Sequence, residues 1–179
     1  KTFRENDDKT PIILMGYANP IEAIGAGTFV ERAKSSDVDG IITVDYPPEE
    51  CMEFTKLLKE KNIDSIFLLS PTSELDRVKL IIEQASGFLY YVSLKGVTGA
   101  ANIDIEQVKS KVGMIRELTD LPIGVGFGVK DAATAKEVAK ISDAVVVGSR
   151  MVQEIESSNK ENLIQNISKL MKELREAVN

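Results

Sequence analysis

Six short apolar runs, each followed by an amphipathic stretch, repeat along this chain and constrain its fold more than any other feature. The runs are four to six residues long and lack the apolar–polar alternation of a half-exposed strand. They are Pro11–Gly16, Gly40–Val44, Ser65–Leu69, Phe88–Val92, Pro122–Val125 and Ala144–Val147. Continuous apolar runs of this length are typical of strands buried on both faces of a parallel sheet.

The stretches between these runs carry apolar residues at helical spacing, as in 78–85 and in the last segment, 163–178. Ser73 and Asp131 are residue types that cap helices, so the pattern predicts helix starts at both positions. Glu49 and Glu50 predict the start of another helix, because acidic residues are favoured in a first turn. Strands therefore alternate with helices, which indicates an α/β fold with a parallel sheet.

Two architectures fit this alternation, a closed (β/α)8 barrel and a doubly wound open sheet. A dinucleotide-binding sheet would carry a Gly-x-Gly-x-x-Gly fingerprint after its first strand, but here that strand runs into Met15–Pro20. Glycine-rich loops instead follow the last two strands, where phosphate-binding barrels hold their anion. The pattern favours the (β/α)8 TIM barrel. No linker or change of composition divides the chain, which predicts a single partial barrel domain over 1–179.

The composition excludes several kinds of function. The net charge of −6 provides no electrostatic attraction for nucleic acid or an anionic membrane. There is no histidine, which removes the commonest general base and metal ligand. The one cysteine, Cys51, cannot form an internal disulfide, and this fits a cytoplasmic protein. No apolar run approaches the roughly 20 residues that span a bilayer.

Two glycine motifs at the ends of consecutive predicted strands indicate an anion site. In Gly124–Gly128, glycines allow backbone amides to approach a phosphate closely. In Val145–Ser149, a buried strand runs into a glycine and then a serine that opens a helix, whose amides attract anions. Either motif alone is equally well an ordinary turn or helix cap. Their positions on neighbouring strands together predict a phosphate site.

Three further features have open interpretations. The loop Ser93–Asn102 is rich in glycine and hydroxyl groups, so it is either a lid over substrate or a flexible surface loop. Tyr90 and Tyr91 precede it and point to opposite faces of their strand, and for either one the alternative role is packing in the core. Asp45 ends the second strand, as a functional carboxylate or as a residue that organises its loop. No pair of carboxylates, metal-ligand cluster or nucleophile motif accompanies these residues.

Four motifs in order along the chain resemble the tryptophan synthase alpha chain family over essentially all 179 residues. They are Leu14–Pro20, Val44–Glu50, Tyr90–Ala100 and Val125–Val129. The resemblance implies a lyase of tryptophan biosynthesis, which splits indole-3-glycerol phosphate by a retro-aldol route into indole and glyceraldehyde 3-phosphate. It implies no cofactor and no metal in this chain. It also implies a partner, the pyridoxal-phosphate-dependent beta chain, in an α2β2 complex.

The same resemblance assigns roles to individual residues of this sequence. The substrate phosphate would be bound by Thr98, Gly99, Gly128, Gly148 and Ser149. Tyr90 and Phe127 would lie against the indole. The beta chain, and communication with its active site, would involve Tyr17, Asn19, Asp45 and Pro47.

The sequence departs from the family pattern in one large respect. The family's barrel has eight strands, and the first strand here corresponds to its third, so six βα units are expected. The catalytic glutamate and aspartate would belong to the two missing units, so no catalytic residue is assigned in this chain and the 179-residue form is expected to be inactive. We therefore keep two alternatives: a non-catalytic module that binds phosphate and a partner, and another phosphate-binding barrel enzyme of indole or sugar-phosphate metabolism.

Overall fold

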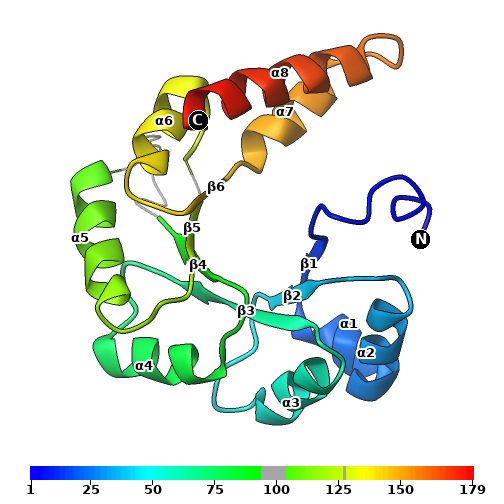
Figure 1. Cartoon of the computed structure of the whole chain (residues 1–179), viewed down its shortest axis with the longest axis vertical. Helices are drawn as coiled ribbons and strands as arrows, with labels where there is room; N and C mark the ends of the chain where they lie inside the picture. The colour runs from blue at the N-terminus through cyan, green and yellow to red at the C-terminus, as the bar shows by residue number, and fades with distance from the viewer. Residues whose placement is uncertain (94–103, 127) are drawn as a thin grey trace. The chain divides into compact units, whose positions relative to one another are not determined.

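The computed structural model describes residues 1–93, 104–126 and 128–179. In these residues, six strands alternate with helices in the order that the sequence predicts (Figure 1). The described chain forms two compact units, one made of residues 1–68 and 74–89 and the other of residues 69–73 and 90–179. The expectation of a single domain stays a prediction.

The first unit contains three parallel strands in sequence order, β1-β2-β3. Its elements are β1 (Ile13–Gly16), α1 (Ala18–Ile24), α2 (Ala26–Lys34), β2 (Gly40–Thr43), α3 (Met52–Glu60), β3 (Asp64–Leu69) and α4 (Leu75–Gln84). Gly16, the last residue of β1, pairs with Thr43, the last residue of β2. Because the strands are parallel and in this register, the loops that follow β1 and β2 begin at the same edge of the sheet.

Apolar side chains from the helices and strands of the first unit form its core. The core comprises Ile21, Val30, Ala33, Val38, Ile41, Phe54, Leu58 and Ile63. The ring of Phe54 lies 6.2 Å from the ring of Phe29 and 6.0 Å from that of Tyr46, measured between ring centres. Aromatic pairs at this spacing add to the stabilisation from apolar burial. The core therefore anchors α1, α2 and α3 to β2.

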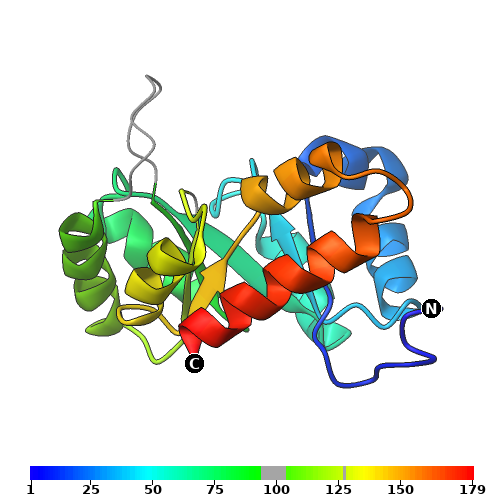
Figure 2. The same ribbon diagram turned by 90° about the horizontal axis from the view of Figure 1, so that it is seen from above.

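The second unit repeats the same pattern with strands in the order β4-β5-β6. Its elements are β4 (Leu89–Val92), α5 (Ile105–Arg116), β5 (Ile123–Gly126), α6 (Ala132–Ala139), β6 (Ala144–Val146), α7 (Ser149–Ser157) and α8 (Leu163–Val178). The long helix α8 runs past α6 and also packs against α7 (Figure 2). In each unit the helices lie on one side of the strands, as in a barrel and unlike a doubly wound sheet (Figure 1).

All six predicted strands are confirmed, with ends that differ from the predicted ones by at most two residues. Strands β2 to β5 are buried on both faces, whereas β1 and β6, the first and last strands, are more exposed. On β1, Leu14 and Met15 are 41% and 53% exposed, and Ala144 on β6 is exposed as well. Continuous apolar character therefore predicts a strand correctly, but how deeply the strand is buried depends on its neighbours.

The predicted helix starts at Glu49–Glu50 and at Ser73 are wrong, and the start at Asp131 is confirmed. Helix α3 begins at Met52 after Cys51, so Glu49 and Glu50 lie in the preceding turn. Helix α4 begins at Leu75 after Glu74, because the Ser73 hydroxyl instead accepts a hydrogen bond from the Ser70 amide and closes a turn. Asp131 caps α6 as predicted, since its carboxylate accepts a hydrogen bond from the Thr134 amide at 2.8 Å.

Candidate functional site

The glycine and serine residues predicted to bind phosphate follow two paired strands of the second unit. Gly126 of β5 pairs with Val146 of β6 in a parallel register. Gly128 and Gly148 each lie two residues beyond this pair, so both leave the sheet at the same edge. The inference that the two motifs lie on neighbouring strand ends is confirmed by this register.

The local backbone at these glycines explains the residue type. Gly128 has a φ of 79°, a conformation that is strained for residues with a Cβ atom. Gly148 is the N-cap of α7 and Ser149 is the first residue of that helix, as predicted. A glycine N-cap has no side chain with which to satisfy the first amides of the helix, and these amides carry the positive end of the helix dipole. This edge of the unit therefore presents an electropositive helix start beside a turn with a positive φ.

Tyr90 lies against the end of β5, and the contact requires a glycine there. A Cβ atom on Gly126 would lie 2.5 Å from the Tyr90 hydroxyl oxygen and 2.7 Å from its Cε2 atom. Ser93 joins the same strand ends, because its amide and its hydroxyl both donate to the Gly126 carbonyl, at 3.0 Å and 2.8 Å. Burial raises the pKa of the Tyr90 phenol above its usual value.

Tyr91, the neighbouring residue on β4, belongs to the core. It is fully buried, and its hydroxyl has no hydrogen-bond partner in the part of the chain that the structure describes. Burial raises the pKa of this phenol too. Both tyrosines are therefore buried. They differ in that Tyr90 contacts the end of β5 at Gly126, whereas Tyr91 packs in the core.

The residues predicted to face a partner follow β1 and β2. Tyr17 and Asn19 lie at the start of α1, and Asp45 and Pro47 lie in the loop after β2. The Asp45 carboxylate accepts a hydrogen bond from the Ala18 amide at 2.7 Å, at the start of α1. Tyr17 and Asn19 flank that amide in sequence and are exposed, and Pro47 is half-buried. Two roles were left open for Asp45, that of a functional carboxylate and that of a residue that organises its loop. The structure shows a contact of the second kind.

The Tyr46–Glu22 contact was not found from the sequence. The Tyr46 phenol donates to the Glu22 carboxylate at 2.6 Å, which raises the pKa of Tyr46 to about 12. The two residues are 24 positions apart and carry no shared motif, so no pattern in one sequence connects them.

Three predicted site residues, Thr98, Gly99 and Phe127, lie outside the described residues. In the described ranges, no group of three or more His, Cys, Asp or Glu side chains is arranged to hold a metal ion. No helix in the described ranges is long and apolar enough to cross a membrane. Asp45 is the one carboxylate in these ranges that lies within two residues after a strand.

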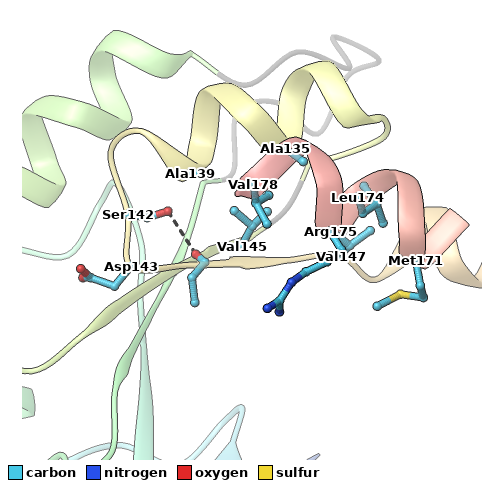
Figure 3. Close-up of a pocket in the computed structure, with 11 residues that line it drawn as sticks. Ala135, Ala139, Ser142, Asp143, Val145, Val147, Met171, Leu174, Arg175 and Val178 are labelled. Atoms are coloured by element: carbon cyan, nitrogen blue, oxygen red, sulfur yellow. Dashed lines mark hydrogen bonds between the residues drawn. The ribbon is translucent and has the colours of Figure 1, made fainter.

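A cavity of about 360 Å³ in the second unit lies between β6, α6 and α8 (Figure 3). Val145 and Val147 form its floor, and Leu174, Arg175 and Val178 of α8 line one side. None of the predicted site residues lines it. The cavity is a gap in the packing of α8 on β6, and the chemistry-bearing residues lie at the strand ends instead.

These observations define a class: parallel βα units of barrel type, with glycine-rich loops after the last two strands. The family model of the tryptophan synthase alpha chain matches residues 1–179. The chain therefore belongs to the tryptophan synthase alpha chain family. Its fold is that of six βα units of a (β/α)8 barrel.

Individual relatives agree with this assignment. The alpha chain of Janthinobacterium sp. (strain Marseille) is 54% identical over 176 residues, which cover 98% of this chain and 66% of the relative. The alpha chain of Nitrosomonas europaea is 52% identical over 98% of this chain and 64% of the relative. The crystal structure of tryptophan synthase subunit alpha from Legionella pneumophila has a TM-score of 0.87 at 35% identity, and covers 99% of this chain and 66% of that chain.

The chain thus spans just under two thirds of the length of the relatives it matches.

Proposed function

We propose that this chain is the phosphate- and indole-binding part of a tryptophan synthase alpha subunit. The activity would be the retro-aldol cleavage of indole-3-glycerol phosphate in tryptophan biosynthesis. The observation that supports this most directly is the register of β5 and β6, which brings Gly128, Gly148 and Ser149 to one edge of the sheet in a chain that matches the family throughout.

The phosphate would be held by backbone amides and one hydroxyl. Gly128 allows a close approach because it lacks a Cβ atom and has a positive φ. The first amides of α7 and the Ser149 hydroxyl supply further donors, and the dipole of α7 favours the negative charge. Local donors of this kind are needed because the net charge of −6 repels a phosphate at longer range. Thr98 and Gly99 would complete the site.

The indole ring would lie against Tyr90 and Phe127. The close approach of Tyr90 to Gly126, at the end of β5, supports this role for its ring. A flat aromatic surface suits a flat aromatic substrate.

In the cleavage itself, the bond between C3 of the indole and the adjacent glycerol carbon breaks. C3 keeps the electron pair and takes up a proton, while the hydroxyl on the departing carbon loses its proton to form the aldehyde. Both transfers need acid–base groups near the reacting atoms. Asp45 is engaged by the Ala18 amide, and we assign no catalytic residue in this chain. The 179-residue form would therefore bind phosphate ligands without turnover.

The chain would act with a pyridoxal-phosphate-dependent beta chain in an α2β2 assembly, and would need no cofactor of its own. Tyr17, Asn19, Asp45 and Pro47 are the residues we assign to the partner and to communication with it. A cytoplasmic location is consistent with the one cysteine, Cys51, being a free thiol.

Calorimetric titration with glyceraldehyde 3-phosphate tests the phosphate site. Ser149→Ala should weaken binding by about tenfold, which corresponds to one lost charge-assisted hydrogen bond. Gly128→Ala should weaken it by about the same factor, because the added Cβ atom obstructs the close approach of the phosphate. Gly113→Ala is the matched control, because nothing lies within 4 Å of a Cβ atom there. Unchanged affinity in both site variants would refute the phosphate assignment.

A turnover assay with indole-3-glycerol phosphate, with and without beta chain, tests whether the 179-residue form has catalytic activity. Release of indole by the 179-residue form would show that it carries its own acid–base groups and would contradict the assignment of no catalytic residue. Binding without turnover is the expected result.

A further inference from the structure

Two hydrogen bonds join helix α1, which follows β1, to the loop after β2. Asp45 accepts from the Ala18 amide at 2.7 Å, and the Tyr46 phenol donates to Glu22 at 2.6 Å. The donor and acceptor residues are 27 and 24 positions apart in sequence. Asp45 and Tyr46, which are neighbours in the loop after β2, thus bind the first turn and the middle of α1. We call these four residues, Ala18, Glu22, Asp45 and Tyr46, the loop clasp.

The loop clasp is attached to the core of the first unit. The Tyr46 ring stacks on Phe54 with a centroid distance of 6.0 Å, and Phe54 is buried. Ile21, between Ala18 and Glu22, is buried in the same cluster. The backbone also contributes, since the Val44 amide donates to the Gly16 carbonyl at 2.8 Å. The positions of α1 and of the loop after β2 are therefore set by contacts with a packed core.

The Asp45 contact caps the start of helix α1. The N-cap residue of α1, Tyr17, makes no side-chain hydrogen bond to the helix, so the cap comes from Asp45 in the loop after β2. A carboxylate at this position both satisfies an amide and suits the helix dipole. Tyr17 itself is 60% exposed. Exposed tyrosines on rigid backbones are typical anchors of protein interfaces.

We propose that Asp45, Tyr46 and Glu22 are positioning residues that hold Tyr17 in a preorganised surface for the beta chain. This inference rests on the proposed function for the identity of the partner. It reverses the expected role of Asp45, whose carboxylate orients the surface through Ala18 rather than contacting the partner. Both hydrogen bonds are solvent-exposed and add little to folding, but ordering α1 and the loop after β2 before association removes an entropic cost of binding.

The test measures the affinity of the native alpha protein for its own beta chain by calorimetry, and its free energy of unfolding in urea. Asp45→Ala should weaken the affinity by about tenfold. Asp45→Asn should stay within about twofold of wild type, because its amide oxygen still accepts from the Ala18 amide. Tyr46→Phe keeps the ring on Phe54 and should weaken the affinity by about threefold. Glu31→Gln is the control, since it breaks a surface ion pair with Lys61 in the same unit.

Combining variants separates positioning from direct contact. Tyr17→Ala should lose less affinity in the Asp45→Ala background than alone, because an unclasped Tyr17 is no longer held in place. The inference is overturned if Asp45→Asn is as weak as Asp45→Ala, since the charge would then act on the partner directly. Strictly additive effects of Tyr17→Ala and Asp45→Ala would overturn it too.

Two further outcomes distinguish this inference from the proposed function. A wild-type protein that does not bind the beta chain refutes the proposed partner and the inference with it. A wild-type protein that binds, with clasp variants that bind equally well, refutes the positioning role alone. Self-association of the alpha protein that Tyr17→Ala abolishes would assign the surface to a second copy and overturn the inference.

Discussion

Replacing Gly126 by alanine tests the packing between the ends of β4 and β5. The new Cβ atom would lie 2.5 Å from the hydroxyl oxygen of Tyr90, 2.7 Å from its Cε2 atom and 2.9 Å from its Cζ atom. Ordinary contacts between such atoms are about 3.5–4.0 Å, so the ring must retreat by roughly 1 Å. Tyr90 is buried on β4, and the Gly126 carbonyl is held by two hydrogen bonds from Ser93. Neither partner is free to move alone.

The size of the effect follows from this geometry. Overpacking a close-packed core lowers the free energy of unfolding by about 1–3 kcal/mol. Gly126→Ala should fall in that range, because the Tyr90 ring cannot move away without disturbing its neighbours. This corresponds to a fall of roughly 5- to 150-fold in the ratio of folded to unfolded protein. The same substitution at Gly113, an exposed position within α5, meets nothing within 4 Å and should stabilise by about 0.5–1 kcal/mol.

Urea denaturation of the two variants against wild type is the measurement. Adding Tyr90→Phe to Gly126→Ala removes the 2.5 Å contact and leaves the two carbon contacts, so it should recover part of the loss. The reasoning is refuted if Gly126→Ala is as stable as wild type, or if Tyr90→Phe and Gly126→Ala act additively. Either result would mean that the Tyr90 ring does not occupy the space that Gly126 leaves.

Three other predictions concern single residues of the second unit. Asp131→Ala removes the cap of α6 and should lower the free energy of unfolding by about 1 kcal/mol in urea. Gly128→Ala forces a Cβ atom onto a φ of 79° and should cost about 1 kcal/mol by the same assay. Asp143 is partly desolvated, but hydrogen bonds from the Ile123 amide and the Arg116 guanidinium outweigh this and lower its pKa. A lowered pKa means stability that is present above the unfolded value of about 4 and lost as the pH falls through the folded value. The difference in unfolding free energy between wild type and Asp143→Asn should therefore persist at pH 5–7 and shrink below about pH 4; a difference that grows toward acid would contradict it.

The strands and the fold class could be predicted from the sequence because their signals are local. Each apolar run is short, and its neighbours mark its ends with Gly, Pro or Asp. The Asp131 cap was predicted for the same reason, since a cap acts on an amide three residues away. Helix α1 was not predicted. It has seven residues, and its cap comes from Asp45, which is 27 positions from Ala18.

The sequence alone therefore determined the βα rhythm and the glycines at the last strand ends. Both depend on backbone preferences that act within a few residues. Only the tertiary structure decided that Gly128 and Gly148 leave the sheet at one edge, since this depends on the register of β5 and β6. It also decided the depth of β1 and β6, and the contact of Tyr46 with Glu22. Contacts between distant positions follow from how elements pack, and no local pattern in one chain encodes them.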